Sequence, residues 1–233
     1  MPMIKYRICS IKNTEDSTKI ISVEALDKKI IFKPGQFVML HIVDQNGQSA
    51  DKRPFSIASS PNSSTIEFCI KILPEGRFTQ KLDKLDVGDT LGIEGPLGTF
   101  YYNHERSAVF IAGGTGIAPF ISMLRYIKEN RIMGDFVLFY SVRTQKHILY
   151  KRELEQLAKA TNIKIIITIT REESTKWNGE HGRVEEQMLK KYLANPKDYR
   201  FYICGPVNMT SSLHNLLVSI GIKEENILFE GWG

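Results

Sequence analysis

The sequence is poor in cysteine and has no long apolar run. Its three cysteines, Cys9, Cys69 and Cys204, are too few and too widely spaced for a disulfide framework or a four-cysteine iron–sulfur cluster. The most apolar run, Ile163–Ile169, is far too short to span a membrane, and residues 1–13 lack the apolar core of a signal peptide. We therefore expect a cytoplasmic protein with no membrane span and no metal site.

The sequence also lacks a strong excess of charge of one sign. Lys and Arg number 31 and Asp and Glu number 26, which gives a formal net charge of +5. The basic residues are spread along the chain, so nucleic acid is not an expected partner. Two interpretations remain: an ordinary solvated basic surface, or a positive field that attracts a phosphorylated cofactor or an acidic protein.

Residues 1–103 have the period of β-strands. Ile4, Tyr6 and Ile8 alternate with polar residues, and the apolar residues from Ile66 to Ile72 do the same. Frequent Gly and Pro residues divide this part of the chain into short segments. The pattern predicts a small antiparallel β-barrel domain.

From residue 104 to residue 233, short apolar runs alternate with helical stretches. The five runs are Ala108–Ala112, Phe136–Tyr140, Ile163–Thr170, Phe201–Cys204 and Ile227–Phe229. Between them, apolar residues such as Phe120, Leu124 and Ile127 share one helical face. This alternation predicts an α/β domain whose parallel five-stranded sheet is covered by helices on both sides. Ligands bind such sheets at the carboxyl ends of the strands.

A glycine-rich stretch follows the first apolar run of the second half. It reads Gly113-Gly114-Thr115-Gly116-Ile117-Ala118-Pro119 and leads from a predicted strand into a predicted helix. Glycines let the backbone approach a pyrophosphate, and the start of a helix offers free N–H groups. Pro119 suits the first helical turn, but it stands where the dinucleotide fingerprint has its third glycine. A plain strand–helix turn is therefore the alternative interpretation.

A second informative stretch is Lys52-Arg53-Pro54-Phe55-Ser56-Ile57-Ala58-Ser59-Ser60. It places a cation, an aromatic ring and hydroxyl groups close together in an extended chain. Phe55 and Ser56 point to opposite sides of the strand, yet both can meet a planar ligand that lies against it. Taken alone, the spacing favours an ordinary strand that ends in a turn.

Together these stretches resemble the motifs of the ferredoxin–NADP reductase family. Arg53–Ser59 resembles the flavin-binding R-x-[YF]-S-x-x-S motif, and Gly113–Pro119 resembles the nicotinamide-nucleotide loop. Cys204-Gly205-Pro206, with Met209 after it, resembles the C-G-P segment. The motifs stand in the family's order and spacing, and the resemblance covers essentially the whole chain. It implies an FAD-dependent oxidoreductase that passes a hydride from NAD(P)H to flavin and electrons to a separate acceptor.

The resemblance also implies roles for the residues of the flavin motif. Arg53, followed by Pro54, is expected to pair with the FAD pyrophosphate. Phe55 is expected to stack on the isoalloxazine ring, where the commoner residue is Tyr, and Ser56 to hydrogen-bond flavin N5. The segment Gly76-Arg77-Phe78-Thr79 resembles the G-x-x-[ST] turn, whose N–H groups and Thr79 hydroxyl hold the pyrophosphate. For Arg77, a solvated charge is the alternative.

In the second half, the resemblance places a nicotinamide nucleotide on the glycine loop. Gly114 and Gly116 are expected to approach its pyrophosphate, and Thr115 and Cys204 to lie near its nicotinamide. The ending Glu230-Gly231-Trp232 resembles the family's terminal E-x-aromatic, in which the aromatic ring covers the flavin and the carboxylate relays protons. Gly233 follows Trp232, so the register of this ending departs from the family pattern. The expected catalytic residues are Ser56, Cys204 and Glu230.

Arginines at the predicted strand ends bear on the choice of nucleotide. Thr170-Arg171 resembles the family's Ser-Arg phosphate pair, and Gly182-Arg183 resembles the G-R of bacterial NADPH-linked members. Arg143 is a third cation at a strand end. These residues favour NADPH, because its 2′-phosphate needs cations, whereas Glu172 and Glu173 favour NADH.

The sequence leaves the electron acceptor open. An acidic ferredoxin, a flavodoxin or an oxygenase component is the expected partner. Three alternatives to a self-sufficient reductase also stand: a flavin reductase whose flavin diffuses freely, an electron-transfer subunit of a multicomponent oxygenase, and a nucleotide-binding module without redox function.

Overall fold

The computed structural model describes residues 2–160, 162–171 and 177–232. Glu172, Glu173 and Gly233 lie outside the described residues. By its internal contacts the chain divides into two compact units: residues 1–102 with residues 118–126, and residues 103–117 with residues 127–233. The domain boundary between residues 103 and 104 stays a prediction, because a segment of the second half groups with the first unit.

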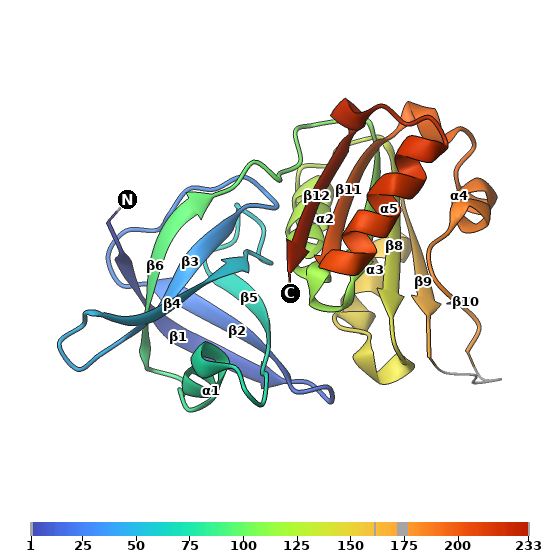
Figure 1. The fold of residues 1–233 in the computed structure, drawn as a ribbon. Coiled ribbons are helices and arrows are strands. Elements are labelled where there is room, and N and C mark those ends of the chain that lie inside the picture. The colour runs from blue at the N-terminus through green and yellow to red at the C-terminus, as the bar shows by residue number, and fades with distance from the viewer. Residues whose placement is uncertain (1, 161, 172–176, 233) are drawn as a thin grey trace. The chain divides into compact units, whose positions relative to one another are not determined.

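The first unit is an antiparallel barrel, as predicted. Its strands are β1 (Ile4–Asn13), β2 (Thr18–Ala25), β3 (Phe37–Val43), β4 (Ser49–Ser56), β5 (Ile66–Lys71) and β6 (Thr90–Leu97), paired in the order β4-β3-β6-β1-β2-β5 (Figure 1). An antiparallel bridge between Ile57, the residue after β4, and Phe68 in β5 closes the barrel. Tyr6 and Ile8 are fully buried, so the predicted alternation describes the core correctly.

A short helix, α1 (Arg77–Asp83), connects β5 to β6. Its buried residues Phe78 and Leu82 lie four positions apart and belong to the barrel core, as the helical period requires. Arg77 and Lys81 are also four residues apart, so both cations lie together on a different side of the helix from Phe78 and Leu82.

The first turns of α2 (Ala118–Glu129) group with the barrel through specific hydrogen bonds. The hydroxyl of Ser122 donates to the carbonyl of Ser59 at 2.7 Å. The guanidinium of Arg125 donates to the carbonyl of Ala58 at 3.0 Å and to the carboxylate of Glu67 at 2.9 Å. These bonds fix the backbone at the end of the motif Arg53–Ser59.

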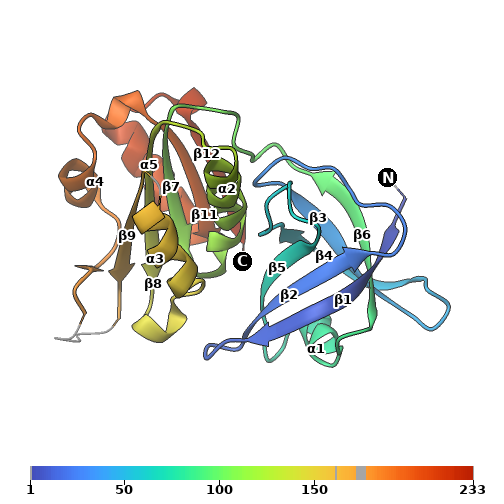
Figure 2. The same cartoon turned by 180° about the vertical axis from the view of Figure 1, so that it is seen from behind.

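The second unit is built on a parallel sheet. Its strands are β7 (Ser107–Gly113), β8 (Asp135–Val142), β9 (Ile163–Ile169), β10 (Glu180–His181), β11 (Arg200–Pro206) and β12 (Ile227–Trp232), in the order β10-β9-β8-β7-β11-β12. The five predicted strands are confirmed, and the two-residue β10 adds a sixth at one edge. Helices α4 (Glu186–Tyr192) and α5 (Val207–Ser219) cover one face, and α3 (Lys151–Ala160) covers the other (Figures 1 and 2).

The order of these strands creates a switch point. From β7 the chain adds β8, β9 and β10 on one side, and then returns to place β11 and β12 on the other. All carboxyl ends lie at one edge because every pairing is parallel. The crevice between the ends of β7 and β11 is where such sheets bind ligands.

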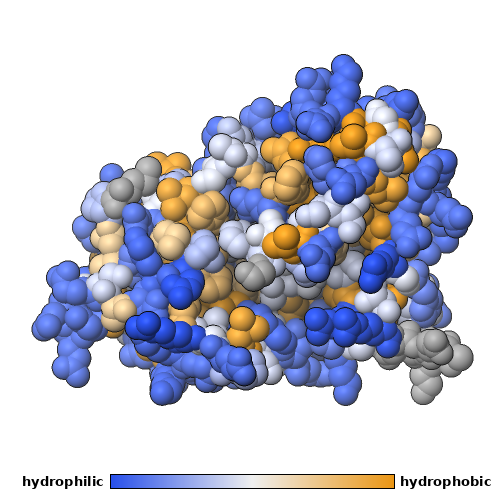
Figure 3. All heavy atoms as spheres, in the orientation of Figure 1, coloured by the Kyte–Doolittle hydropathy of each residue, from blue (hydrophilic) through white to orange (hydrophobic). Residues whose placement is uncertain are grey.

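Hydrophilic side chains cover much of the face seen in Figure 3, with apolar areas between them. Large apolar side chains that stand exposed include Ile31, Met133 and Phe229. No helix within the described ranges is both long and apolar enough to cross a lipid bilayer.

Candidate functional site

The motif that resembles a flavin-binding sequence, Arg53–Ser59, begins on β4, the strand at one edge of the antiparallel sheet. In an extended strand, Asp51, Arg53 and Phe55 share one side and Lys52 and Ser56 share the other. Pairing with β3 sets the register, with Leu40 opposite Arg53 and Phe37 opposite Ser56. The strand thus presents a charged and aromatic side that the α1 helix approaches.

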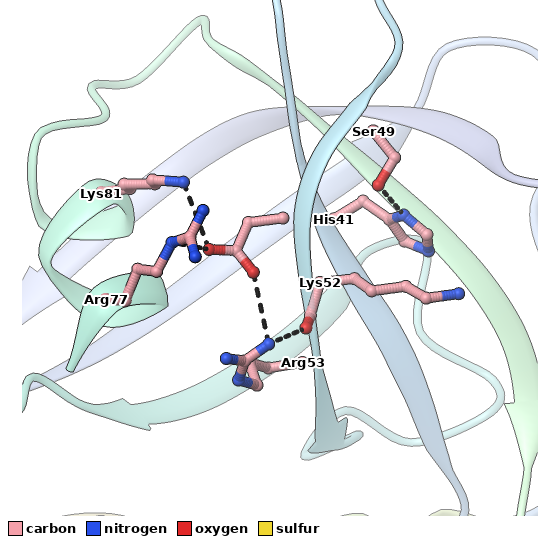
Figure 4. Close-up of polar contacts among 7 residues, drawn as sticks. His41, Ser49, Lys52, Arg53, Arg77 and Lys81 are labelled. Atoms are coloured by element: carbon pink, nitrogen blue, oxygen red, sulfur yellow. Dashed lines mark hydrogen bonds and ion pairs between the residues drawn. The ribbon is translucent and has the colours of Figure 1, made fainter.

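Three cations meet around Asp51 on this side. Its carboxylate lies 3.2 Å from Arg53, 3.2 Å from Lys81 and 3.6 Å from Arg77. Figure 4 shows Arg77 and Lys81 on α1 and Arg53 on β4, all directed at the carboxylate that lies between them. We call these three residues the cation cluster. Sequence reasoning named Arg53 and Arg77 but missed Asp51 and Lys81, because only the folded chain brings α1 to β4.

The members of this group differ in exposure. The side chain of Asp51 is 9% exposed, whereas those of Arg53 and Arg77 are 54% and 77% exposed. Burial raises the pKa of Asp51, but the hydrogen bond and charge of Lys81 and the charges of Arg53 and Arg77 outweigh it, so the pKa falls below its ordinary value. The carboxylate therefore stays charged at neutral pH, beneath cations that extend into solvent.

The predicted phosphate turn forms the start of α1. Gly76 is the residue before the helix, and Thr79 is buried inside it. The hydroxyl of Thr79 accepts the backbone N–H of Leu73 at 3.1 Å and donates to the carbonyl of Gly76 at 3.2 Å. This hydroxyl braces its own loop, so phosphate contact through Thr79 stays a prediction, and Arg77 is the more accessible group of the segment.

Phe78 and the barrel core hold the ring of Phe55. Its centroid lies 5.5 Å from that of Phe78, with the ring planes tilted by 38°. Phe78 is 2% exposed, and Phe55 packs partly against the barrel core. The Phe55 ring is therefore held in place by buried partners while part of its surface stays free.

Ser56 is buried and its hydroxyl lacks a partner. The residue is 8% exposed, and no described residue hydrogen-bonds its Oγ. A buried hydroxyl left without a bond costs free energy, so such an atom calls for an explanation. The alternative of a strand serine bonded to backbone is not what is observed. With Arg53 of the cation cluster on the same strand, these residues fit a flavin dinucleotide.

A second polar group lies on the other side of β4 (Figure 4). His41 contacts the Ser49 hydroxyl through Nδ1 at 2.8 Å, and its Nε2 lies 3.2 Å from Glu94, which also pairs with Lys52 at 3.1 Å. Burial, followed by the positive charge of Lys52, lowers the pKa of His41. At neutral pH this histidine is therefore uncharged.

The glycine loop in the second unit continues directly from β7. It forms a single tight turn of helix, Gly114–Ile117, before α2 begins at Ala118. Gly114 has a φ of +54° and open space around its Cα. At Gly116, a Cβ atom would lie 2.3 Å from the carbonyl oxygen of Cys204. The loop therefore needs a glycine at position 116 to pack on β11, and this packing sits at the switch point.

The C-G-P segment completes this edge. Gly205 lies against Gly113, so that a Cβ on Gly205 would meet the Gly113 backbone at 3.1 Å. A Cβ on Gly113 would clash with Met209 and Pro206, at 2.5 and 2.9 Å. The two predicted nucleotide segments, far apart in the sequence, are thus packed backbone to backbone.

Cys204, Glu230 and Trp232 come together at the ends of β11 and β12. The indole Nε1 of Trp232 donates to the Sγ of Cys204 at 3.3 Å, and Glu230 pairs with Cys204 in the strand register. Burial raises the pKa of the Cys204 thiol, so it stays protonated. Burial also raises the pKa of Glu230 to about 7, and no described residue hydrogen-bonds its Oε2. This carboxyl can therefore exchange a proton near neutral pH.

The predicted arginines lie at the same carboxyl-end edge. Arg143 follows β8 and Arg171 follows β9, and the backbone N–H of Arg171 bonds the carbonyl of Arg143 at 2.9 Å. Arg183 follows β10. All three side chains are exposed, and none has an acidic partner among the described residues. The Thr170 hydroxyl bonds the carbonyl of Val142 at 3.1 Å.

The fold and both sites define a class of protein: an oxidoreductase with a flavin-binding barrel and a nicotinamide-nucleotide-binding α/β domain. Family models agree. Residues 6–102 match the oxidoreductase FAD-binding domain, and residues 110–215 match the oxidoreductase NAD-binding domain. The chain belongs to the ferredoxin–NADP reductase family.

The chain is also similar to individual relatives. It is 36% identical over 210 residues to sulfhydrogenase 1 subunit gamma of Pyrococcus furiosus, covering 87% of this chain and 68% of that one. It is 32% identical over 228 residues to the anthranilate 1,2-dioxygenase electron transfer component of Acinetobacter baylyi, covering 96% of this chain. The chain spans 65% of the length of that component, so the relative carries further sequence.

Solved structures share the fold. A ferredoxin NADP⁺ reductase from Neisseria gonorrhoeae, with bound FAD and NADP, matches with a TM-score of 0.85 and 20% identity over 99% of each chain. The flavohem-like FAD/NAD-binding domain of nitric oxide dioxygenase from Vibrio cholerae matches with a TM-score of 0.88 and 19% identity, covering 99% of this chain and 98% of that one. At these identities the likeness concerns the fold alone.

Proposed function

We propose that this chain is an NAD(P)H-dependent reductase that binds FAD in its barrel and delivers electrons to a separate acceptor. Bound FAD supplies the redox chemistry, taking a hydride from the nicotinamide and releasing electrons singly or in pairs. The observation that carries the proposal is the unpartnered buried hydroxyl of Ser56 on the strand that also bears Arg53 and Phe55. A matching nucleotide loop in the second unit supports it.

The barrel residues bind and orient the flavin. Arg53 and Arg77 pair with its pyrophosphate, and a guanidinium suits this because it offers two parallel donors. Phe55 packs against the isoalloxazine ring and limits its tilt. Ser56 donates a hydrogen bond at N5, which satisfies the orphaned hydroxyl and stabilises the charge that develops there.

The α/β residues bind and orient the nicotinamide nucleotide. Backbone N–H groups of Gly114 and Gly116 face its pyrophosphate, a task that the glycine loop at the start of a helix suits. Thr115 and Cys204 would contact its nicotinamide ring. The protonated thiol and the Trp232 ring pack rather than react, and Glu230, with its pKa near 7, holds or releases a proton.

We further propose that NADPH is the preferred nucleotide. Arg143, Arg171 and Arg183 stand exposed at three neighbouring strand ends, where a 2′-phosphate needs cations. The opposing residues, Glu172 and Glu173, lie outside the described part of the chain. A chain that uses NADH needs no such group of cations at these strand ends.

A second candidate is an electron-transfer subunit that works only when docked on a larger enzyme. The relatives named above, an electron-transfer component of a dioxygenase and a sulfhydrogenase subunit, favour it. In either case the net charge of +5 supports an acidic acceptor protein, such as a ferredoxin, a flavodoxin or an oxygenase component. The free state of Cys9, Cys69 and Cys204 supports a reducing, cytoplasmic location.

Desalting the purified protein and recording its visible spectrum tests the proposal. A retained flavin spectrum supports a reductase or subunit with bound FAD. A colourless protein that oxidises NADPH only when flavin is added points to a diffusing flavin. A protein that oxidises NADPH with artificial electron acceptors, but with neither a ferredoxin nor a flavodoxin, favours the subunit that works only when docked. The absence of any flavin-linked activity contradicts the proposal.

A further inference from the structure

A carboxylate that the flavin motif does not require lies against the cation cluster. Asp51 precedes Arg53 by two residues on β4 and lies within 3.2–3.6 Å of Arg53, Lys81 and Arg77. The NH1 group of Arg53 is divided between Asp51, at 3.2 Å, and the carbonyl of Lys52, at 2.7 Å. One nitrogen of each of these three cations therefore already lies near an anion of the chain itself.

We propose that Asp51 is an internal counter-ion that competes with the flavin pyrophosphate for Arg53, Arg77 and Lys81 and so limits the affinity for FAD. This inference rests on the proposed function, because it assumes that the cluster holds the pyrophosphate. Asp51 then sets whether FAD stays with the protein or exchanges with solution.

The direction of the effect follows from charge and exposure. Without FAD, Asp51 relieves the repulsion among three neighbouring cations. With FAD, it lies close to two negative phosphates and opposes them. Removing the carboxylate thus destabilises the free protein and favours the complex, and both changes tighten binding.

An opposite expectation is that Asp51 orients the cations and that its removal weakens binding. The three cationic side chains are 54%, 77% and 39% exposed. Ion pairs between such exposed side chains are weak and hold them only loosely. The three cationic side chains therefore lose little orientation when the carboxylate is removed. Repulsion by a fixed anion that is itself 9% exposed is screened less by solvent. The competition is therefore the larger effect.

Titration of apoprotein with FAD and with riboflavin, which has no phosphate, tests the inference. Asp51→Asn keeps the size of the side chain and is expected to lower the dissociation constant of FAD about threefold to thirtyfold. The dissociation constant of riboflavin is expected to stay unchanged. Raising the salt concentration should weaken FAD binding more steeply in this variant, because an additional uncompensated cation faces the phosphates.

Two further variants separate the possible failures. Asp83→Asn also removes one negative charge, at the end of α1. Asp83 pairs with Lys19 at 2.7 Å and not with the cation cluster, so FAD binding should not change. Arg53→Ala should weaken FAD binding about tenfold or more. If Arg53→Ala has no effect, the proposed flavin site fails. Two results would overturn only the inference on Asp51, provided that Arg53→Ala weakens FAD binding. One is that Asp51→Asn leaves FAD binding unchanged or weakens it. The other is that Asp51→Asn tightens the binding of riboflavin as much as that of FAD.

Thermal unfolding gives a second measurement that tolerates a less stable apoprotein. The apoprotein with Asp51→Asn should melt below wild type, and saturating FAD should raise its melting temperature by more than it raises that of wild type. An equal or smaller rise would overturn the proposal.

Discussion

Replacing Gly116 by alanine tests the packing that forms the nucleotide loop. An added Cβ would lie 2.3 Å from the carbonyl oxygen of Cys204, 2.6 Å from its carbonyl carbon and 2.8 Å from the nitrogen of Gly205. The closest of these is about 1.1 Å short of the 3.4 Å at which ordinary contact begins. All three atoms belong to the backbone of β11, which is hydrogen-bonded to β7 on one side and to β12 on the other.

Because β11 cannot rotate away as a side chain would, the loop must move. Overpacking of this kind costs about 1–3 kcal/mol, so the melting temperature of Gly116→Ala should fall by roughly 3–10 °C. A displacement of about 1 Å at the loop should also slow hydride transfer by up to a hundredfold.

Gly114→Ala is the matched control. It changes the same loop, but its Cβ meets nothing within 4 Å, and only its φ of +54° resists the change. That strain costs about 1 kcal/mol. Calorimetry and the NADPH concentration dependence of flavin reduction compare the two variants. If Gly116→Ala lowered the melting temperature and the rate of flavin reduction no more than Gly114→Ala does, the packing argument would be refuted.

Three further predictions concern the proposed chemistry. Arg171→Ala combined with Arg183→Ala should raise KM for NADPH about tenfold or more and leave KM for NADH nearly unchanged, which steady-state kinetics with both nucleotides measures. Ser56→Ala should keep FAD bound but slow its reduction in stopped flow by roughly tenfold to a thousandfold, and an unchanged rate would exclude Ser56 from the chemistry. The pKa of Glu230 is raised to about 7 from an ordinary 4.5, so the folded chain binds an extra proton between these values and loses stability as pH rises through that window. Glu230→Gln should remove this loss of stability. If the free energy of unfolding varied with pH in the same way in this variant and in wild type, the raised pKa of Glu230 would be contradicted.

Much of the fold could be predicted from the sequence because its signals are local. Period-two alternation found two of the barrel strands, β1 and β5, and strand–helix alternation found five strands of the parallel sheet. The strand β10 escaped because two residues, Glu180 and His181, are too few to show any period. Residues 118–126 follow the glycine loop in sequence, yet they group with the barrel, because bonds such as that from Ser122 to Ser59 span 63 residues.

The site could be predicted only where a motif names its own residues. Arg53, Phe55 and Ser56 adjoin in sequence, so one motif identified them together. Asp51 and Lys81 belong to the same charged group but stand 30 residues apart and carry no motif. Their contact depends on where α1 lies beside β4, which neither composition nor period encodes. The Thr79 hydroxyl is a similar case, since its bonds within the loop depend on the start of α1.

The most direct test of the central claim is rapid anaerobic mixing of the FAD-loaded, desalted protein with NADPH, followed by the absorbance of the flavin band. The account predicts that the band bleaches within a single turnover, with one flavin reduced per chain. NADPH should bleach the band faster than NADH does, or should reach half of its maximal rate at a lower nucleotide concentration. A protein that retains FAD but whose flavin band is unchanged by either nucleotide would contradict the account.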